Sequence, residues 1–526
     1  QGVRGDVTIS DESRRLLGGA FAIEFAGRMY DRSQIRQIDT FRVVDNSRAP
    51  APSPHRLENT FCGREGELQH LTHLWEANPE RTILLLGEAG IGKSFLVDRF
   101  RAVNAIPGVT FKCSSELRQM PFHPLVRWVE GLRAEAALTG EPQASVDVER
   151  MELIKSVSDL LHASPGTSSA ERLGLPSAKE LLPRRLCRLI GMYVPRGGIV
   201  HFDDVQWADP STRDLIALLA EKPLAQRLQV FTARNEFLAP WRNTTSVETL
   251  ELTPLDSTAM TELVHSVAGQ VNLPQPLMRQ ILSLSEGVPL YAEELTRELV
   301  SDRNAAVLEA GDSDAHNLSE RVPRTLHDLL MSRIDSVGRI KPIAQFAAAA
   351  GSEFTLELLA AAMQEPKSNL MEAIATLLRQ NLIVKLDDGR FAFRHALLRE
   401  AAYQSQARAA RVDAHRRLAD VLAADATTTL RSPEALAWHY SRAGDDRLAL
   451  RYALIAARKA AAKAASNEAV GHYRTALELV GNVGKVTEVG DPGDAVMLQL
   501  EILMVLGIQL GMVHGPGAAQ VEECFQ

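Results

Sequence analysis

The sequence predicts a multidomain fold of the α/β plus α class, with a parallel-sheet domain followed by helical regions. The chain has 526 residues, whereas one domain usually has about 100–200 residues. From residue 61 onward, apolar runs of strand length alternate with amphipathic helical stretches, the pattern of a parallel sheet covered by helices. From about residue 254 the strand signal stops, and nine alanines between residues 451 and 470 favour closely packed helices.

The composition excludes several other classes of protein. Hydrophobic residues make up 45% and charged residues 24% of the chain, values typical of a globular protein rather than a disordered or collagen-like one. The net charge is −8, from 58 Lys and Arg against 66 Asp and Glu, so the chain has no overall basic footprint for nucleic acid or an anionic membrane. Neither partner is expected for this segment.

The cysteines and the chain ends indicate the environment of the protein. The four cysteines lack the spacing of a zinc site or a disulfide framework, which favours a reducing, cytoplasmic location; they are Cys62, Cys113, Cys187 and Cys524. The apolar stretch from Ile502 to Val513 is shorter than the roughly 20 residues that span a bilayer, so we expect a packed helix. No signal-peptide pattern follows Gln1. We expect both ends to be cut from a longer protein.

The parallel-sheet domain is expected over residues 59–253. Its four expected strands are Thr82–Leu86, Val109–Phe111, Gly198–Phe202 and Leu228–Thr232. Residues 141–180 are polar and in places rich in Pro, Gly and Ser, which predicts an insertion on the domain surface. Helices dominate residues 254–320, which we interpret as a helical lid.

Two further units flank this domain on the N-terminal side. Residues 1–46 are expected to form strands near 7–10, 21–25 and 40–44 with a helix at 11–17. Residues 47–58 are expected to be a linker. Its prolines lack amide donors and favour an extended spacer.

Residues 321–402 have the outline of a winged-helix domain. Helical segments are followed by the strand Leu382–Leu386, a turn at residues 387–389 and the strand Phe391–Phe393, and such a hairpin would cover the helices as a wing. Residues 403–526 are expected to be helical throughout. Ala469, Tyr473 and Ala476 have the spacing found in the second helix of a tetratricopeptide (TPR) repeat. The interval from Ala449 to Ala469 breaks the repeat period, so the prediction is a truncated TPR-like α-solenoid.

The strongest motif is a phosphate-binding loop (P-loop) between an expected strand and an expected helix. Its eight residues match G-x-x-x-x-G-K-[ST] and are Gly87, Glu88, Ala89, Gly90, Ile91, Gly92, Lys93 and Ser94. Glycines let backbone amides turn toward phosphate oxygens, and the helix N-terminus adds partial positive charge. Lys93 would reach the β- and γ-phosphates and Ser94 would ligate Mg²⁺. The motif therefore predicts a P-loop NTPase sheet that binds ATP or ADP with Mg²⁺.

Two carboxylates end the expected strand that contains Ile199 to Phe202. Beside a P-loop, one carboxylate can hold the magnesium ion and the other can orient an attacking water. We expect Asp203 to hold the metal and Asp204 to orient the water, with their order left open. Without the P-loop, such a strand end would more often be a capped loop.

Arg234 follows another expected strand, at the edge of the sheet where ligands bind in open α/β folds. Its planar guanidinium could contact the γ-phosphate, and a surface salt bridge is an equal alternative. We expect His201, which lies inside an apolar strand, to be a core histidine rather than a catalytic one.

Together these residues resemble the signal-transduction ATPases with numerous domains (STAND), a regulatory branch of the AAA-like P-loop NTPases. The resemblance is greatest to the bacterial subgroup fused to class III adenylate or guanylate cyclases. Residues 61–68 are similar to a family motif that borders the adenine, which implies that Gly63 and Arg64 contact the base. Residues 203–212 resemble the acidic strand end followed by Trp-Ala-Asp-Pro-Ser, although Gln206 stands where the family usually has His.

The resemblance extends to the lid and the winged helix. Residues 287–290 are similar to the family's Gly-x-Pro motif, which implies that Pro289 closes over the base. Residues 393–400 resemble a segment whose histidine senses the β-phosphate of ADP, a role that would fall to His395. Residues 5–13 and 41–44 look like the last strands of a class III cyclase domain. That family's catalytic residues lie before this point, so this chain alone should not make cyclic nucleotide.

The sequence thus predicts an ATP-dependent regulatory switch with slow hydrolysis. The resemblance implies that ADP keeps the switch closed, that the output is a fused cyclase or similar domain, and that the TPR-like helices bind a protein partner. It also implies nucleotide-dependent homo-oligomers. One alternative is a large ATP-dependent transcription activator of the helix-turn-helix type without its DNA-binding end, although residues 321–400 carry 11 Lys and Arg against 9 Asp and Glu. Another is a nucleotide-locked scaffold that never hydrolyses ATP.

Overall fold

The structure is a computed structural model of the chain. It describes residues 8–10, 23–30, 37–43, 61–78, 80–138, 145–161, 178–242, 244, 246–269, 271, 273–300, 325–386, 389–425, 432–463, 465–486 and 492–525. The helix expected at 11–17, the linker expected at 47–58 and part of the turn expected at 387–389 lie outside these ranges.

Three antiparallel strands form the first described unit, namely β1 (Thr8–Ser10), β2 (Ile23–Tyr30) and β3 (Gln37–Val43). The sheet order is β1-β3-β2. Strands were expected near all three positions, and β2 runs further than predicted, to Tyr30.

Five parallel strands form the central sheet, in the order β5-β6-β7-β4-β8. They are β4 (Thr82–Leu86), β5 (Gly108–Lys112), β6 (Ile199–Asp203), β7 (Leu228–Ala233) and β8 (Val247–Glu251). The first four confirm the expected strands. The edge strand β8 was not predicted, because Glu248 and Glu251 interrupt its apolar residues and it is only half-buried.

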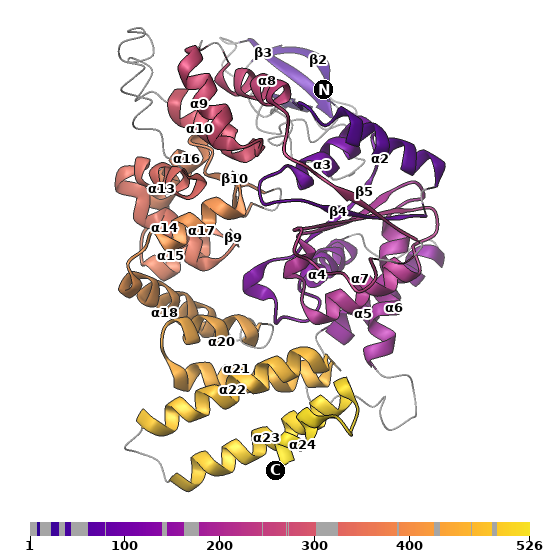
Figure 1. The fold of residues 1–526 in the computed structure, drawn as a ribbon, viewed down its shortest axis with the longest axis vertical. Helices are drawn as coiled ribbons and strands as arrows, with labels where there is room; N and C mark the ends of the chain where they lie inside the picture. Colours follow the sequence, from indigo (N-terminus) through magenta and orange to yellow (C-terminus); the bar gives the residue numbers. More distant parts are fainter. Residues whose placement is uncertain are drawn as a thin grey trace.

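Successive side chains of β4 point to opposite faces of this sheet, as the period of a strand requires. Ile83 and Leu85 pack in one core cluster and Leu84 and Leu86 in the other. The helices of the α/β domain cover these two faces (Figure 1). They are α2 (Glu65–Ala77), α3 (Lys93–Val103), α4 (His123–Leu138), α5 (Ser145–Leu161), α6 (Ala178–Tyr193) and α7 (Pro210–Glu221).

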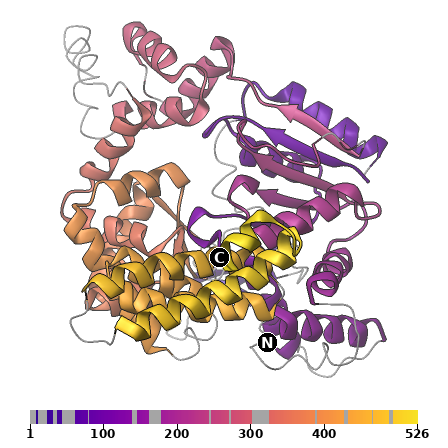
Figure 2. The same ribbon diagram turned by 60° about the horizontal axis from the view of Figure 1, so that its bottom comes forward.

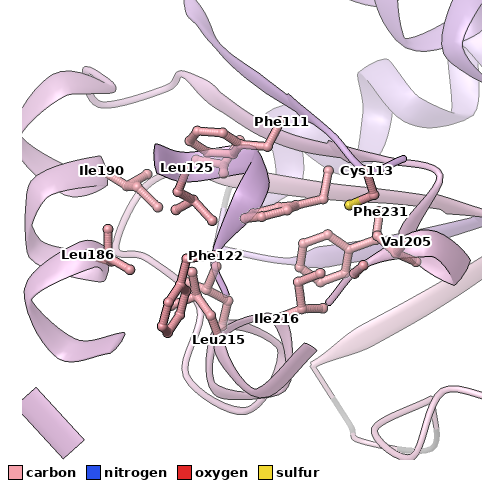
Figure 3. Close-up of a cluster of buried hydrophobic side chains, with 14 of the residues drawn as sticks. Phe111, Cys113, Phe122, Leu125, Leu186, Ile190, Val205, Leu215, Ile216 and Phe231 are labelled. Atoms are coloured by element: carbon pink, nitrogen blue, oxygen red, sulfur yellow. The ribbon is translucent and has the colours of Figure 1, made fainter. Parts of the chain in front are cut away.

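The larger of the two clusters corrects the prediction of a surface insertion at residues 141–180. Within α5, Ile154, Val157 and Leu161 are buried in the same cluster as Leu186 of α6. Their spacing along the chain places them on one face of the helix. Figure 3 shows Leu186 and Ile190 of α6 facing Phe122, Leu125 and the strand residues Phe111 and Phe231. Helix α5 therefore belongs to the core of the domain.

The helices expected after residue 254 form the next unit, with a core of their own. They are α8 (Ser257–Ala268), α9 (Gln275–Ser285) and α10 (Pro289–Val300). Cys62, from the segment before α2, packs in this core together with Met260 and Leu295. The segment before α2 is thus shared between the sheet domain and this helical unit.

The third unit contains helices and a small antiparallel sheet. Ile383 pairs with Phe393, as expected for the hairpin, and a further strand pairs with Phe391 to give the order β10-β11-β9. The elements are α13 (Leu326–Ser336), η5 (Gly338–Ile340), α14 (Lys341–Ala350), β9 (Glu353–Phe354), α15 (Leu356–Met363), α16 (Lys367–Arg379), β10 (Ile383–Lys385), β11 (Phe391–Phe393) and α17 (Ala396–Gln404).

The described C-terminal region is helical, as predicted, and consecutive helices pack on one another. Its helices are α18 (Arg408–Ala424), α20 (Pro433–Arg442), α21 (Asp446–Ala462), α22 (Ser466–Val486), α23 (Pro492–His514) and α24 (Ala519–Phe525). Figure 2 shows this layer reaching from the third unit to the α/β domain. Small residues such as Ala453 and Ala457 are fully buried and permit close packing of the helices.

Helix α23 is longer than the apolar stretch predicted from the sequence. Its segment Val496–His514 is long and apolar enough to cross a membrane by length and composition, and 28% of that window is buried. Ile502, Leu506 and Leu510 pack into the core of the C-terminal layer, which agrees with the predicted packed helix. The opposite face carries exposed apolar residues, including Met504 and Ile508.

Candidate functional site

The P-loop lies between β4 and α3 and depends on its glycines. Gly92 is the N-cap of α3 with φ 99°, and Gly90 has φ 82°, a region that residues with a side chain rarely adopt. A Cβ atom on Gly87 would lie 2.8 Å from a methyl carbon of Ile91. The loop therefore presents backbone amides at the start of a helix, which is a suitable place for phosphate oxygens.

The ammonium group of Lys93 lies within this loop. Its Nζ donates hydrogen bonds to the carbonyl oxygens of Gly87 and Glu88, each at 2.8 Å. Burial lowers the pKa of Lys93, while the negative charges of Asp204 and Asp203 act in the opposite direction. The charge of Lys93 is thus positioned between the loop and the two carboxylates.

Asp203 lies at the end of β6 and joins three elements. Its Oδ1 accepts hydrogen bonds from Ser94 Oγ at 2.7 Å and from Thr232 Oγ1 of β7 at 2.6 Å. Burial by itself would raise the pKa of Asp203, but His201 and the two hydroxyl donors outweigh it and lower the pKa to about 2. An ionised carboxylate beside a serine hydroxyl offers the hard oxygen donors that Mg²⁺ prefers. The residues present therefore fit a magnesium ion.

Asp204 has a different environment, although it is the next residue. It adopts φ 59° before the short helix η4 (Val205–Trp207), and its backbone amide donates to Thr232 Oγ1 at 2.9 Å. Its Oδ1 accepts from Gln206 Nε2 at 2.9 Å. Burial and the charge of Asp203 raise the pKa of Asp204. A carboxylate with a raised pKa accepts a proton more readily, which suits a residue that orients water.

Arg234 follows β7 at the same edge of the sheet. Its backbone amide donates to Gln206 Oε1 at 3.3 Å, and its guanidinium carbon lies 5.7 Å from the ring centre of Trp207. Its positive charge acts on the pKa of both Lys93 and Asp204. The structure therefore brings Arg234 close to the P-loop and the carboxylates.

The residues expected beside the base hold the helical unit against the α/β domain. Arg64 donates to the carbonyl oxygen of Thr253 at 2.5 Å, and a Cβ on Gly63 would lie 2.2 Å from Ala259 Cβ of α8. Pro289 begins α10, and the next amide, that of Leu290, donates to the carbonyl oxygen of Gly90 at 3.3 Å. The helical unit thus touches the P-loop itself.

His395 lies in the third unit rather than in the α/β domain, at the N-cap of α17. Four residues later, Arg399 forms an ion pair of 2.5 Å with Glu116 of the short helix η2 (Ser115–Leu117) in the α/β domain. The segment that contains His395 is therefore fastened to the α/β domain close to β5.

The sequence analysis gave no role to Thr232, whose hydroxyl contacts both Asp203 and the backbone of Asp204. Its position at the end of the strand next to the acidic one was the available signal. His201 is buried, as predicted, but its Nε2 also lies 3.7 Å from Asp203 Oδ1 and so affects the site.

Comparisons with known proteins agree with this geometry. The family profile of the AAA ATPase domain matches residues 60–231. An uncharacterized protein of Rhizobium meliloti (strain 1021) is 27% identical over 543 aligned residues, covering 96% of this chain and 51% of the relative. The chain thus spans about half the length of the curated relative it matches.

Two solved structures are similar in outline. A STAND protein with a tetratricopeptide repeat sensor from Pyrococcus horikoshii has a TM-score of 0.47 and 12% identity, over 88% of this chain and 63% of that chain. RuvB of Thermotoga maritima has a TM-score of 0.32 and 14% identity, over 63% of this chain and 92% of that chain. The sheet order, the P-loop and the profile match define a P-loop NTPase fold with an AAA ATPase domain.

Proposed function

We propose that this chain is an ATP-binding switch of the STAND type, with slow hydrolysis that resets its state. The contact of Ser94 and Thr232 with Asp203, directly beside the P-loop, is the observation that carries the proposal. In a P-loop enzyme such a serine and a strand-end aspartate hold the magnesium ion, and the ion neutralises charge on the phosphates.

Each residue of the site has a proposed role. The P-loop residues 87–94 bind the phosphates through their amides, and Lys93 reaches the β- and γ-phosphates. Ser94 and Asp203 hold Mg²⁺, Asp204 orients the attacking water, and Arg234 contacts the γ-phosphate. Gly63, Arg64, Pro289 and His395 complete the nucleotide site, with His395 sensing the β-phosphate of ADP.

The helical layer at the C-terminus contacts the segment that follows the acidic strand end. Glu468 of α22 accepts a hydrogen bond from the amide of Ser211 in α7 at 2.7 Å. His472 Nε2 lies 3.0 Å from the carbonyl oxygen of Gln119. Moving a switch from 1:99 to 99:1 requires about 5.5 kcal/mol of differential binding. Contacts from several units to one nucleotide can supply such a difference.

The wider role belongs to a longer protein. We infer that β1–β3 are the end of a class III cyclase domain, that the third unit is a winged helix, and that the C-terminal helices are TPR-like and bind a protein partner in the cytoplasm. Nucleotide-dependent homo-oligomers would follow from the same scheme. A transcription activator with its DNA-binding end elsewhere remains the alternative output, and a helical array serves both.

Calorimetric titration of ATP tests nucleotide binding. Lys93→Ala removes the ammonium within the loop, so the affinity for ATP should fall at least 100-fold. Lys222→Ala, an exposed lysine beyond the end of α7, is the control and should bind ATP as the parent does. Equal affinity in the parent and in Lys93→Ala would refute the proposed site.

Single-turnover hydrolysis separates a switch from a nucleotide-locked scaffold. Asp204→Asn should retain ATP binding and lose the group that orients water, so the single-turnover rate should fall about 100-fold or more. A parent protein that binds ATP but hydrolyses none in a single turnover would favour the scaffold.

A further inference from the structure

A second cavity lies far along the chain from the P-loop, between α18 and the end of α20. Its volume is about 380 Å³, which lies within the range of about 300–1,000 Å³ that is typical of small-molecule sites. Its polar lining residues are Tyr403, Arg408, Arg411, His415, Ser441 and Arg442. The cavity thus joins α17 and α18 of the chain's middle part to α20 of the C-terminal layer.

Three of these lining residues are arginines, and the lining contains no carboxylate. Within the part of the chain that the structure describes, no carboxylate lies within ion-pair distance of Arg408, Arg411 or Arg442, whereas the nearby Arg416 and Arg417 of α18 pair with Asp445 and Asp413. A guanidinium stays charged at any physiological pH. The cavity therefore gathers three positive charges that no carboxylate neutralises.

Aromatic rings hold two of the arginines in place. The guanidinium carbon of Arg411 lies 5.4 Å from the ring centre of Tyr403, and that of Arg442 lies 5.9 Å from the ring centre of Trp438. Such contacts restrict the side chains without neutralising their charge. The guanidinium groups are thus arranged before any ligand arrives, which reduces the entropic cost of binding.

The floor of the cavity is a buried histidine that adds polar groups. His415 Nε2 lies 2.9 Å from the hydroxyl of Tyr403, and its Nδ1 lies 2.9 Å from Nδ1 of His439. Burial, followed by the charges of Arg442 and Arg411, lowers the pKa of His415 to about 4. His415 is therefore neutral at neutral pH, and the positive charge of the cavity comes from the arginines.

We propose that this cavity binds a small phosphorylated metabolite, through its phosphate groups. Guanidinium groups match phosphate oxygens with two parallel hydrogen bonds and attract their charge. The cavity is much larger than a single water, whose share of liquid volume is about 30 Å³, so it has room for a body beyond the phosphate. Such a ligand would connect Arg408 and Arg411 of α18 with Arg442 of α20.

Calorimetry with pyrophosphate as the probe tests this proposal. The full chain carries Lys93→Ala, so that the P-loop does not contribute, and the ionic strength is held constant. One pyrophosphate should bind per chain. Arg408→Gln and Arg442→Gln, which change exposed residues, should each weaken binding at least tenfold. Arg417→Gln is the matched control, since it lies on α18 but outside the cavity lining, and should bind as the parent does.

Two outcomes would overturn the proposal. The first is the absence of pyrophosphate binding, or equal weakening by Arg417→Gln. The second is citrate binding as tightly as pyrophosphate at the same ionic strength, which would assign the cavity to polycarboxylates instead. Because every variant carries Lys93→Ala, a failure of the proposed ATP site would leave the contrast between Arg408→Gln and Arg417→Gln readable.

Discussion

Two adjacent aspartates at the end of β6 have pKa values that move in opposite directions. Asp203 accepts from two hydroxyl groups and lies near His201, which lowers its pKa to about 2 despite burial. Burial and the neighbouring charge raise the pKa of Asp204. Pairs of carboxylates separated in this way usually divide the work of a site. The division supports Asp203 as the metal ligand and Asp204 as the residue that orients water.

The metal role of Asp203 gives a prediction for Asp203→Asn. The asparagine keeps the shape but loses the charge, so the gain in ATP affinity that Mg²⁺ provides should fall at least tenfold, while binding in EDTA should change little. Calorimetry with and without Mg²⁺ measures the difference. Asp204→Asn is the control and should keep the magnesium effect. The reverse pattern in the two variants would exchange the two roles.

Asp203 also implies a pH dependence of stability. Its folded pKa of about 2 lies below the ordinary value of 3.8, so its ionised form stabilises the fold at pH values above about 4. That contribution is lost as the pH falls from about 4 to about 2. Melting temperatures measured across this range should therefore fall more steeply for the parent than for Asp203→Asn.

The sequence revealed most of this site but not the contacts that tune it. The P-loop and the acidic strand end are local patterns, and chemistry restricts which residues can serve there. The role of Thr232 depends on β7 lying beside β6, and that order follows from the fold rather than from any motif. The same limit explains why β8 was missed, since it is stabilised by pairing with β4 rather than by its own apolar pattern.

At the scale of elements, the start of α7 is capped by two carboxylates from different units. Asp209 accepts from the amide of Thr212, and Glu468 of α22 accepts from the amide of Ser211. Burial and then the charge of Glu468 raise the pKa of Asp209 to about 7. Burial also raises the pKa of Glu468, which faces Lys463 and Asp214 as well. Residues more than 250 positions apart meet here, so no sequence pattern could have indicated the contact.

This pair predicts that docking of α22 on α7 weakens above neutral pH. The folded pKa of Asp209 lies above its ordinary value of 3.8, so its contribution to stability is complete below about pH 4 and is lost as the pH rises through about 7. Glu468→Gln keeps an oxygen acceptor for Ser211 but removes the like charge. The variant should therefore hold α7 more firmly than the parent at pH 8, and equally at pH 5.

Hydrogen exchange of the amides in residues 205–220 measures this difference, with parent and variant compared at the same pH. The exchange rate at pH 8 should be several-fold slower in Glu468→Gln. Glu478→Gln, which changes an exposed residue of the same helix, should match the parent. Faster exchange in Glu468→Gln than in the parent would mean that the charge of Glu468 stabilises the contact.

At the scale of the whole molecule, two ionic contacts fasten the third unit to the α/β domain. Arg399 of α17 pairs with Glu116 of η2, and their side chains are only 11% and 9% exposed. Glu353 of β9 pairs with both Arg127 of α4 and Arg390. Together with the contact of α22 on α7, these pairs close a ring of units around the nucleotide site. A switch that opens must break at least one of them.

The pair of Glu116 and Arg399 gives the sharpest test of this ring. Removing one partner of a buried pair typically costs about 3–5 kcal/mol. Arg399→Glu should therefore release the third unit, increase the radius of gyration in small-angle scattering and speed the loss of bound ADP about tenfold or more. The double variant Glu116→Arg with Arg399→Glu restores opposite charges and should recover most of the compact form.

A matched exchange of an exposed pair separates this effect from a general change of charge. Lys367 and Glu357 have side chains that are 56% and 68% exposed, and such a pair contributes only about 0–1 kcal/mol. Exchanging their charges should leave both the radius of gyration and the ADP release rate unchanged. If Arg399→Glu alone also leaves both unchanged, then the third unit is held by Glu353 and its two arginines, and the opening step must break that network instead.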